Sequence, residues 1–542
     1  MAGLATTLGS GAMTNSFDEI KGMDLLFIIG ANPTEAHPIV GQKMLAAHKA
    51  GALLIVADPR RTALARRANI WLQLKPGTDI ALLNGIMKVI VDNNWHDLTF
   101  IAKHTENFQA MLPILDQYPL DKVEQITGVP RELIIKAAKK YARIPKAGIF
   151  YTLGITQHAH GVNNVLSISN LALLTGHLGK PFMGVNPLRG QNNVQGVCDM
   201  GMLPNVYPGY QPVTDPISRE KFETAWQRKL PDTVGLQIPA MFDAAIAGKL
   251  KTMYIIGENP AVSHANLDWV RSALNSLDFL VVQDIFLTET AKLADVILPA
   301  ASYAEKDGTF TNSERRIQRV RKWLAPLCNT MPDSDIIIKL SGMMGYPMTY
   351  NGPGAVMAEI KDLTPIYGGI TYERLDKKGL QWPVLNKEHP GTPYLHDNGK
   401  FTRGKGKFIP TEFEFTAEMP CAEYPFIFST GRIIQHYNTM TADNCAHLTK
   451  LKPNDLLMLH PIDGEKLGLE SGHTAKISSR RGTVFGKVTV TDMVMPGMAW
   501  MSFHFSSELT NNVTSNARDP IAGTYAYKIS AVKIERFWEA LF

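Results

Sequence analysis

The chain has 542 residues, of which 45% are hydrophobic and 19% charged, and its formal net charge is +5. This length exceeds what one hydrophobic core organises, so two to four domains are expected. The composition is that of a globular protein, the small net charge argues against a dedicated nucleic-acid-binding protein, and no apolar stretch approaches the roughly 18 residues of a membrane-spanning helix.

The alternation of short apolar runs with helical patterns in the first part of the chain predicts a parallel sheet covered by helices. The runs at 24–30 and 52–57 have the length and apolar character of buried parallel strands. The segment 70–74 predicts a third strand, and PGTD at 76–79 predicts a helix start. There is no GxGxxG motif, so the usual NAD-binding sequence is missing.

A second pair of strands resembles the first. MYIIGENP (253–260) is similar to LLFIIGANP (25–33), and LVVQD (280–284) is similar to LLIVAD (53–58). From the strand-end glycine to the aspartate, Gly30 to Asp58 spans 28 residues and Gly257 to Asp284 spans 27. We interpret this repeat as two related α/β units that present strand-end loops to a nucleotide-like ligand, with a chance similarity of short apolar strands as the alternative.

Polar residues at the predicted strand ends are candidate ligand contacts. Asn32 and Asn259 offer amides, and Asp58 and Asp284 can accept hydrogen bonds from ribose hydroxyls; turn and cap roles are the alternative. After a predicted strand at 149–153, Gln157 is the preferred ligand candidate. The neighbouring histidines at 158 and 160 lack a nearby third metal ligand and are expected to be hydrogen-bonded loop residues.

The segment from Gly184 to Gly201, GVNPLRGQNNVQGVCDMG, follows an apolar helical run and predicts a long polar loop. Its glycines permit close approach of the backbone to a ligand. Its single arginine, Arg189, is a fixed cation of the kind that binds small oxyanions in bidentate fashion. The alternative is an ordinary surface loop.

The remaining chain predicts further ligand loops and a barrel. A strand at 295–299 leads into a polar loop at 305–316, and residues 342–420 predict an irregular connecting segment. From residue 424 the pattern is β-rich, with a hairpin turn at Gly482, and indicates a closed barrel of about 120 residues. Polar loops at 431–437 and 511–515 are either ligand loops or plain surface.

The predicted fold class is therefore α/β, with two Rossmann-like parallel-sheet units and a C-terminal β-barrel. We expect four parts: α/β domains at 1–191 and 192–341, a connecting segment at 342–420 and the barrel at 421–542. The four cysteines, Cys198, Cys328, Cys421 and Cys445, are scattered and form no CxxC pair. This argues against disulfides and against a zinc or iron–sulfur site held by this chain alone, and it favours a reducing, cytoplasmic location.

These segments together resemble the molybdopterin oxidoreductase family, and within it the formate dehydrogenase catalytic subunits. The most specific stretch is 184–201. Supporting stretches are IIGANPTEAHP, VADPRR, PGTDIALLNG, VVQDIFLTETAKLADVILPA and GTFTNSERRIQ. The resemblance covers essentially the whole chain. It implies two molybdopterin guanine dinucleotides that hold one molybdenum or tungsten atom, and a barrel of the double-psi type.

The resemblance also assigns the candidate site residues. It places one dinucleotide on Gly30, Asn32, Asp58, Arg60 and Asp79, and the other on Gly257, Asn259, Gln283, Asp284, Thr288 and Asp307. It places Gln157 and Gln191 near the pterins, and Thr430, Gly431, Arg432, His436 and Asn511 in the barrel loops that close over the cofactor. Arg189 becomes the active-site arginine that binds formate, which yields carbon dioxide, two electrons and a proton while the cofactor performs the chemistry. No residue of the chain is implied as a metal ligand, and Cys198 receives no such role.

The sequence departs from the family in one respect. Family members carry an N-terminal [4Fe–4S] domain and then the metal's selenocysteine or cysteine ligand, followed in formate dehydrogenases by a histidine; neither is in this sequence. Our interpretation is the downstream part of a selenoprotein whose in-frame UGA was taken as a stop, or else a split enzyme. The upstream nucleotide sequence distinguishes these. In either case the chain alone is expected to lack formate dehydrogenase activity.

The sequence is compatible with two other functions. One is another molybdopterin oxidoreductase, such as a relative of nitrate reductases; the other is a non-catalytic protein that carries or helps to assemble the cofactor. The expected partners of a formate dehydrogenase are the N-terminal iron–sulfur portion and an electron-transfer subunit. The acceptor is left open between ferredoxin, a hydrogenase module, NAD through another subunit, and a quinone.

Overall fold

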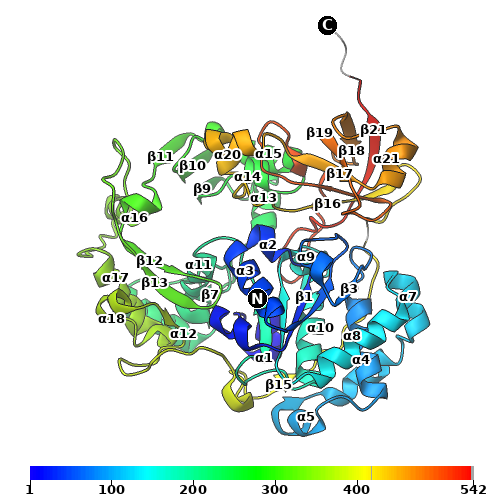
Figure 1. The fold of residues 1–542 in the computed structure, drawn as a ribbon. Coiled ribbons are helices and arrows are strands. Elements are labelled where there is room, and N and C mark those ends of the chain that lie inside the picture. Colours follow the sequence, from blue (N-terminus) through cyan, green and yellow to red (C-terminus); the bar gives the residue numbers. More distant parts are fainter. Residues whose placement is uncertain (417, 539–542) are drawn as a thin grey trace. The chain divides into compact units, whose positions relative to one another are not determined.

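The computed structural model describes residues 1–416 and 418–538, and the chain divides into two compact units (Figure 1). The first unit comprises Met1–Leu188, Pro260–Arg271 and Tyr394–Phe542, and the second comprises Arg189–Asn259 and Ser272–Pro393. Each unit is assembled from separate stretches of sequence. The linear division into four parts stays a prediction. In the part of the chain that the structure describes, no helix has the length and hydrophobicity to cross a membrane.

A five-stranded parallel sheet forms the α/β part of the first unit. Its strand order is β3-β2-β1-β5-β6, the arrangement of a Rossmann-like fold. The strands are β1 (Leu25–Ile29), β2 (Leu53–Ala57), β3 (Ile70–Leu72), β5 (Ala147–Tyr151) and β6 (Gly184–Pro187). The predicted parallel sheet is thus confirmed, and its strands β1, β2 and β5 are apolar because helices cover both faces.

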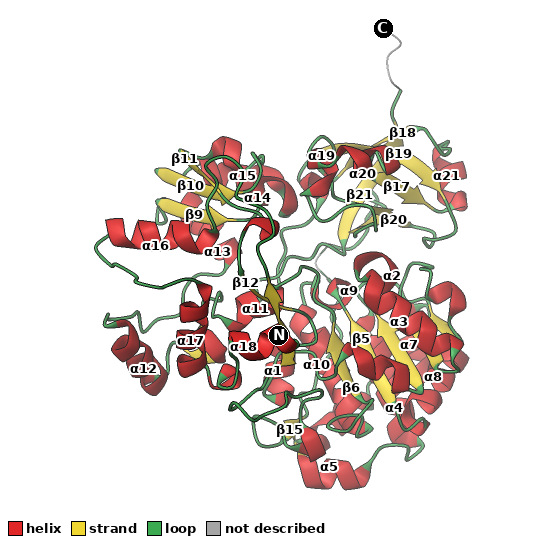
Figure 2. Cartoon of the chain, turned by 60° about the vertical axis from the view of Figure 1, so that its left-hand side comes forward, coloured by secondary structure: helices red, strands yellow, loops and turns green. Residues whose placement is uncertain are grey.

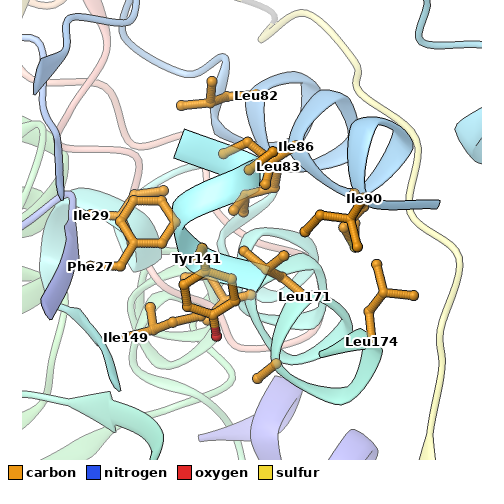
Figure 3. Close-up of a cluster of buried hydrophobic side chains, with 14 of the residues drawn as sticks. Phe27, Ile29, Leu82, Leu83, Ile86, Ile90, Tyr141, Ile149, Leu171 and Leu174 are labelled. Carbon is orange, nitrogen blue, oxygen red and sulfur yellow. The ribbon is translucent and has the colours of Figure 1, made fainter. Parts of the chain in front are cut away.

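Alternate residues of β1 enter two different cores. Phe27 points into a large cluster with helices on one face, whereas Ile28 points into a smaller cluster on the other face. Figure 3 shows Phe27 and Ile29 of β1 among side chains of the helices that cover the first face. These helices are α4 (Asp79–Asp92), α8 (Arg131–Arg143) and α10 (Gly161–Leu174); on the second face lies α3 (Pro38–Lys49). Shorter helices of this unit are α1 (Ala2–Leu8), α2 (Pro33–Ala36), α5 (Leu98–His104), α7 (Leu120–Thr127), α9 (Leu153–Thr156) and α14 (Pro260–Ser263).

The segment 184–201 is not one long loop, so that prediction was wrong in part. Gly184–Pro187 is strand β6, which pairs with β5 through the register Gly148↔Gly184. Residues Val194–Asp199 form the short helix α11. The irregular parts are residues 188–193, which contain Arg189, and the turn at 200–201.

A closed six-stranded barrel completes the first unit and confirms the prediction for the C-terminal region. Its strand order is β16-β20-β17-β19-β18-β21, with parallel pairs β16–β20 and β17–β19. The strands are β16 (Phe426–Thr430), β17 (Leu456–Leu459), β18 (Thr474–Ser478), β19 (Thr483–Val490), β20 (Met498–Met501) and β21 (Ser530–Arg536). The β18–β19 hairpin turns through Gly482, as the sequence predicts.

The second unit repeats the first three strands of the first unit. Its parallel sheet has the order β11-β10-β9, which matches β3-β2-β1, and the strands are β9 (Thr252–Ile256), β10 (Phe279–Asp284) and β11 (Val296–Pro299). Gly30 has φ 55° and donates its N–H to Ala57 O; Gly257 has φ 63° and donates to Gln283 O. The same left-handed glycine therefore closes the same strand pair twice, which confirms the predicted repeat.

The rest of the second unit consists of a three-stranded antiparallel sheet, the short antiparallel pair of β7 (Val206–Tyr207) and β8 (Gln211–Pro212), and helices, several of which are labelled in Figure 2. The sheet consists of β12 (Gly308–Thr311), β13 (Arg316–Val320) and β14 (Leu380–Gln381). The helices are α11, α12 (Pro216–Trp226), α13 (Ile238–Ile246), α16 (Asp333–Met343), α17 (Pro353–Leu363) and α18 (Tyr372–Lys377). Because α17 and α18 are regular helices, the prediction of an irregular segment over 342–420 was wrong there.

Candidate functional site

In the first unit, charged residues from a strand end and from the barrel meet around Trp500. Asp58 follows β2 and accepts a hydrogen bond from the backbone N–H of Arg60 at 2.8 Å. The Arg60 guanidinium stacks over the Trp500 ring of β20, with 4.0 Å from Cζ to the ring centroid. A Cβ on Gly431 would lie 2.9 Å from the same ring, so this position requires glycine.

Lys528 connects this group to two further predicted residues. Its Nζ donates to the backbone carbonyl of Thr430, and its backbone N–H donates to the carbonyl of Gln157 at 3.3 Å. The ammonium also acts electrostatically on Asp58, Arg60 and Arg432. The structure therefore brings Asp58, Arg60, Gln157, Thr430 and Gly431 together, and Lys528 adds a cation that the sequence analysis did not identify.

Burial shifts the pKa values of this cluster toward neutrality. Burial raises the pKa of Asp58 from 3.8 to about 6 against the lowering effect of Arg60, and it raises the pKa of Asp79 to about 7. Burial lowers the pKa of Lys528 from 10.5 to about 7, although part of this side chain is accessible to solvent. Clustered groups with such shifts are characteristic of sites that bind a charged ligand.

The other predicted barrel residues contact groups of the first unit besides Trp500. Asn511 donates from Nδ2 to the carbonyls of Val262 and Ser263 at 3.2 and 3.1 Å. Arg432 lies over the Tyr437 ring at 6.0 Å. His436 contacts the Lys452 carbonyl through Nε2 at 2.8 Å, so this nitrogen is engaged within the barrel.

The histidines flanking Ala159 are loop residues of the first unit. His158 donates from Nε2 to the Gly154 carbonyl at 2.8 Å, and burial lowers its pKa to about 4, which keeps the ring neutral. His160 lies 3.7 Å from Glu414. Both histidines line a small pocket that also involves Gly77 and Phe413.

In the second unit, Arg189 is held at its backbone and at its side chain. Ser313, in the loop after β12, accepts the Arg189 backbone N–H at 3.0 Å. The guanidinium Nε donates to Gln195 Oε1 at 3.1 Å, and Nη1 lies 3.9 Å from the thiol of Cys198. Burial raises the pKa of Cys198, so the thiol stays neutral and does not cancel the arginine charge. Gln191, two residues after Arg189, is exposed.

Some strand-end residues of the second unit are hydrogen-bonded within the protein, whereas others are accessible. Gln283 is buried and its amide contacts Tyr254 and Asp333, while Asn259 Oδ1 accepts from Thr290. A Cβ on Gly257 would meet no atom within 4 Å, so the backbone is open on that side. The remaining predicted residues accept hydrogen bonds from nearby backbone at or beyond strand ends: Asp284, the last residue of β10, accepts from Ile285 N, Thr288 from Ala291 N, and Asp307 from Lys322 N.

Comparison with known proteins identifies the family of the chain. A model described as molybdopterin oxidoreductase matches residues 3–343, and one described as Molydopterin dinucleotide binding domain matches residues 426–531. The chain belongs to the molybdopterin oxidoreductase family. The predicted resemblance is thereby confirmed, and the two matches correspond to the α/β region and to the barrel.

Individual members of the family align over almost the full chain. It is 46% identical over 541 residues to the F420-dependent formate dehydrogenase subunit alpha of Methanocaldococcus jannaschii, covering 99% of this chain and 80% of the relative. It is 40% identical over 543 residues to formate dehydrogenase H of Escherichia coli, covering 99% and 76%. The solved acetylene hydratase of Pelobacter acetylenicus has the same fold, with a TM-score of 0.78, 20% identity, and coverage of 99% of this chain and 80% of that one.

The residues of this molybdopterin oxidoreductase fit a polar dinucleotide in the first unit. Among the described residues, Asn32 Nδ2, Arg60 Nη1 and Asn511 Oδ1 are buried atoms with no hydrogen-bond partner. Buried polar atoms are normally paired, so the unpaired Arg60 Nη1 in the charged cluster indicates a ligand. The Arg60 donor beside the Lys528 ammonium suits phosphate oxygens, and Asn32 offers a further donor after β1, the strand that pairs with β2.

Proposed function

We propose that this chain carries the substrate site and the dinucleotide-binding surfaces of a formate dehydrogenase, which converts formate into carbon dioxide, a proton and two electrons. Relatives with 40–46% identity over nearly the whole chain are named formate dehydrogenases. Arg189, whose guanidinium is fixed at Nε, supports formate as the substrate.

Arg189 suits a planar monoanion. Since Nε is engaged with Gln195, we assign substrate binding to the edge formed by Nη1 and Nη2, of which Nη1 also lies 3.9 Å from the Cys198 thiol. Two parallel N–H donors match the two oxygens of a carboxylate and fix its plane, so the C–H bond of formate takes one direction. Carbon dioxide carries no charge, and the same arginine therefore holds the product less strongly than the substrate.

The cofactor in this proposal is a pair of molybdopterin guanine dinucleotides with one molybdenum or tungsten atom, which supplies the two-electron chemistry when bound. Arg60, Asn32 and Lys528 would hold phosphate or hydroxyl groups of one dinucleotide in the first unit. The second dinucleotide would use the open backbone at Gly257 and the strand-end and loop residues of the second unit. The proposed set is Gly30, Asn32, Asp58, Arg60, Asp79, Gln157, Thr430, Gly431, Arg432, His436, Asn511 and Lys528 for the first unit, and Gln191, Gly257, Asn259, Gln283, Asp284, Thr288 and Asp307 for the second.

The electrons must leave toward partner subunits. Several relatives are named alpha subunits, which indicates assembly with other chains. We propose that this chain likewise transfers electrons through an iron–sulfur portion to a redox subunit, and that it does so in the cytoplasm.

The test is steady-state turnover of the holoenzyme with formate and an artificial dye as electron acceptor. Arg189→Met is expected to raise the KM for formate by more than tenfold, because a charge-assisted bidentate contact contributes at least about 1.5 kcal/mol. Arg321→Met is the matched control, since Arg321 forms an exposed ion pair with Asp376 in the same unit.

The alternatives predict different results. A nitrate reductase relative would oxidise the reduced dye with nitrate and leave formate unchanged. A cofactor carrier would retain molybdopterin through purification without turning over either anion. Equal formate kinetics in wild type and Arg189→Met would contradict the role of the arginine.

A further inference from the structure

Asp199, a fully buried carboxylate in the second unit, collects four hydrogen bonds. Its Oδ1 accepts from Gln195 Nε2 at 2.8 Å and from Tyr210 Oη at 2.7 Å. Its Oδ2 accepts from Tyr367 Oη at 2.8 Å and from Trp382 Nε1 at 2.7 Å. Asp199 ends α11, where the helix dipole disfavours a negative charge, so the stability of this helix does not explain the residue.

These donors favour the ionised form of Asp199. The indole of Trp382 and the amide nitrogen of Gln195 can only donate, so each carboxylate oxygen faces a group that cannot accept a proton. Burial raises the pKa of Asp199, and the donors from Tyr210, Gln195 and Tyr367 together with the Arg189 charge oppose that shift. Removal of a donor therefore leaves a buried charge less well compensated.

The negative charge of Asp199 fixes which way the Gln195 amide points. Gln195 is completely buried and lies between a group that only accepts, Asp199, and a group that only donates, Arg189. Only one orientation satisfies both neighbours: the nitrogen toward Asp199 and the oxygen toward Arg189 Nε. With Asp199 ionised, the Gln195 amide oxygen faces Arg189 and accepts the hydrogen bond from its Nε.

The Gln195 amide also separates the charges of Asp199 and Arg189. A carboxylate in direct contact with Arg189 would form a bidentate pair and occupy the edge that an anion needs. Gln195 transmits the fixed position of Asp199 to the guanidinium through a neutral group. Arg189 is thus oriented by a carboxylate whose oxygens are engaged by other donors.

We propose that Asp199 and Gln195 are positioning residues that orient the Arg189 guanidinium toward the substrate anion. The inference rests on the proposed function, because it takes Arg189 as the formate-binding residue. The chain of contacts runs from Asp199 through the Gln195 amide to Arg189 Nε, while Ser313 holds the Arg189 backbone.

The first experiment compares Gln195→Met with Gln211→Met in the holoenzyme. Methionine has a similar size to glutamine but lacks the amide; Gln211 donates to the Pro208 and Leu363 carbonyls at 2.6 and 3.0 Å in the same unit. Gln195→Met is expected to raise the KM for formate about tenfold, with kcat changed by less than about threefold, because binding of the anion is what loses its oriented partner. Gln211→Met is expected to keep the wild-type KM.

Two further variants test Asp199 itself. Asp199→Asn places an NH2 group, which can only donate, opposite the donors that now bind the carboxylate. The KM for formate is expected to rise, as in Gln195→Met. Tyr367→Phe removes one donor from Asp199 while leaving the ring and every hydrogen bond of Gln195, and a rise of about two- to fivefold is expected even if Asp199→Asn does not fold. Thermal unfolding of each variant establishes that the fold is retained.

A direct probe separates the two proposals. Phenylglyoxal modifies accessible guanidinium groups, and peptide mass mapping reports the rate at Arg189 with and without formate. Protection by formate in wild type and Gln211→Met, but not in Gln195→Met at the same formate concentration, supports the positioning role. Equal protection in Gln195→Met, or an equal KM, overturns that role alone; no protection in wild type overturns the formate site at Arg189.

Discussion

Replacing Asp79 with asparagine is expected to stabilise the first unit at neutral pH, although the change removes a carboxylate from the start of α4. Burial, helped by the nearby Asp58 charge, raises the pKa of Asp79 from 3.8 to about 7 against the effect of its own backbone N–H. Between these pH values the folded protein keeps a proton that the unfolded chain has released. Stability therefore falls as pH rises through this window, by roughly 4 kcal/mol for this residue. Asparagine does not titrate and avoids the loss.

Urea unfolding of the cofactor-free chain between pH 4 and 8 measures this effect through far-UV circular dichroism. The difference in unfolding free energy between Asp79→Asn and wild type should be small at pH 4 and should grow to roughly 4 kcal/mol in favour of the variant above pH 7. Asp92→Asn, at the other end of the same helix, is the control, because Asp92 is half exposed and paired with Lys88. A difference that is independent of pH, or that favours wild type at neutral pH, would refute the reasoning.

Two further changes test the core and the charged cluster. Leu83→Ala is expected to cost about 2–5 kcal/mol of unfolding free energy, because Leu83 is fully buried on α4 (Figure 3), whereas Leu98→Ala at a 60% exposed site should cost less than about 0.5 kcal/mol in the same urea titration. Lys528→Met is expected to stabilise the cofactor-free chain most below pH 7, because burial lowers the Lys528 pKa to about 7 and makes the charged form unfavourable in the fold. This gain in stability should shrink as the pH rises toward 10.5. Unfolding midpoints at pH 6.5 and 9.5 measure the gain, and a gain that increases with pH would contradict the prediction.

The repeated strands were predictable because their signals are local. Runs such as LLFII and MYII have strand length and apolar character, and the glycine after each run adopts φ 55° or 63°, which favours glycine in any context. The parallel order then follows from the alternation with helices. The barrel was predictable for the same reason, since short strands with turn residues recur along 424–536.

Strand β6 was not predicted because its residues have low β-strand propensity. The sequence GVNP contains glycine, asparagine and proline, which favour turns. The structure places it at the edge of the sheet, and a Cβ on Gly184 would lie 1.8 Å from Asn15 Oδ1 and 2.1 Å from Thr14 Oγ1. Close packing against a segment about 170 residues away selects glycine there, and no window of sequence contains that contact.

The charged residues show a similar limit. Lys528 lies in AYKIS, beside the last barrel strand, where an alternating pattern explains it equally well as an exposed residue. Only the fold brings its ammonium to the Thr430 carbonyl and near Asp58. Asp199 is likewise an unremarkable acidic residue in CDMG, and its four donors come from positions between 195 and 382.

The two aspartates, Asp58 and Asp199, show how buried charge distinguishes a ligand site from a support. Asp199 accepts hydrogen bonds from four donors within 2.8 Å, so both carboxylate oxygens are fully hydrogen-bonded within the protein. Asp199 therefore acts through the side chains that it binds. The cluster around Asp58 is incomplete: its carboxylates and Lys528 have pKa values shifted toward neutrality, and the Arg60 Nη1 atom beside them is buried without a partner among the described residues. A fold retains such unfavourable charges where a bound ligand compensates them. The first unit should therefore gain more stability from a phosphate-bearing cofactor than the second unit gains from an anion at Arg189.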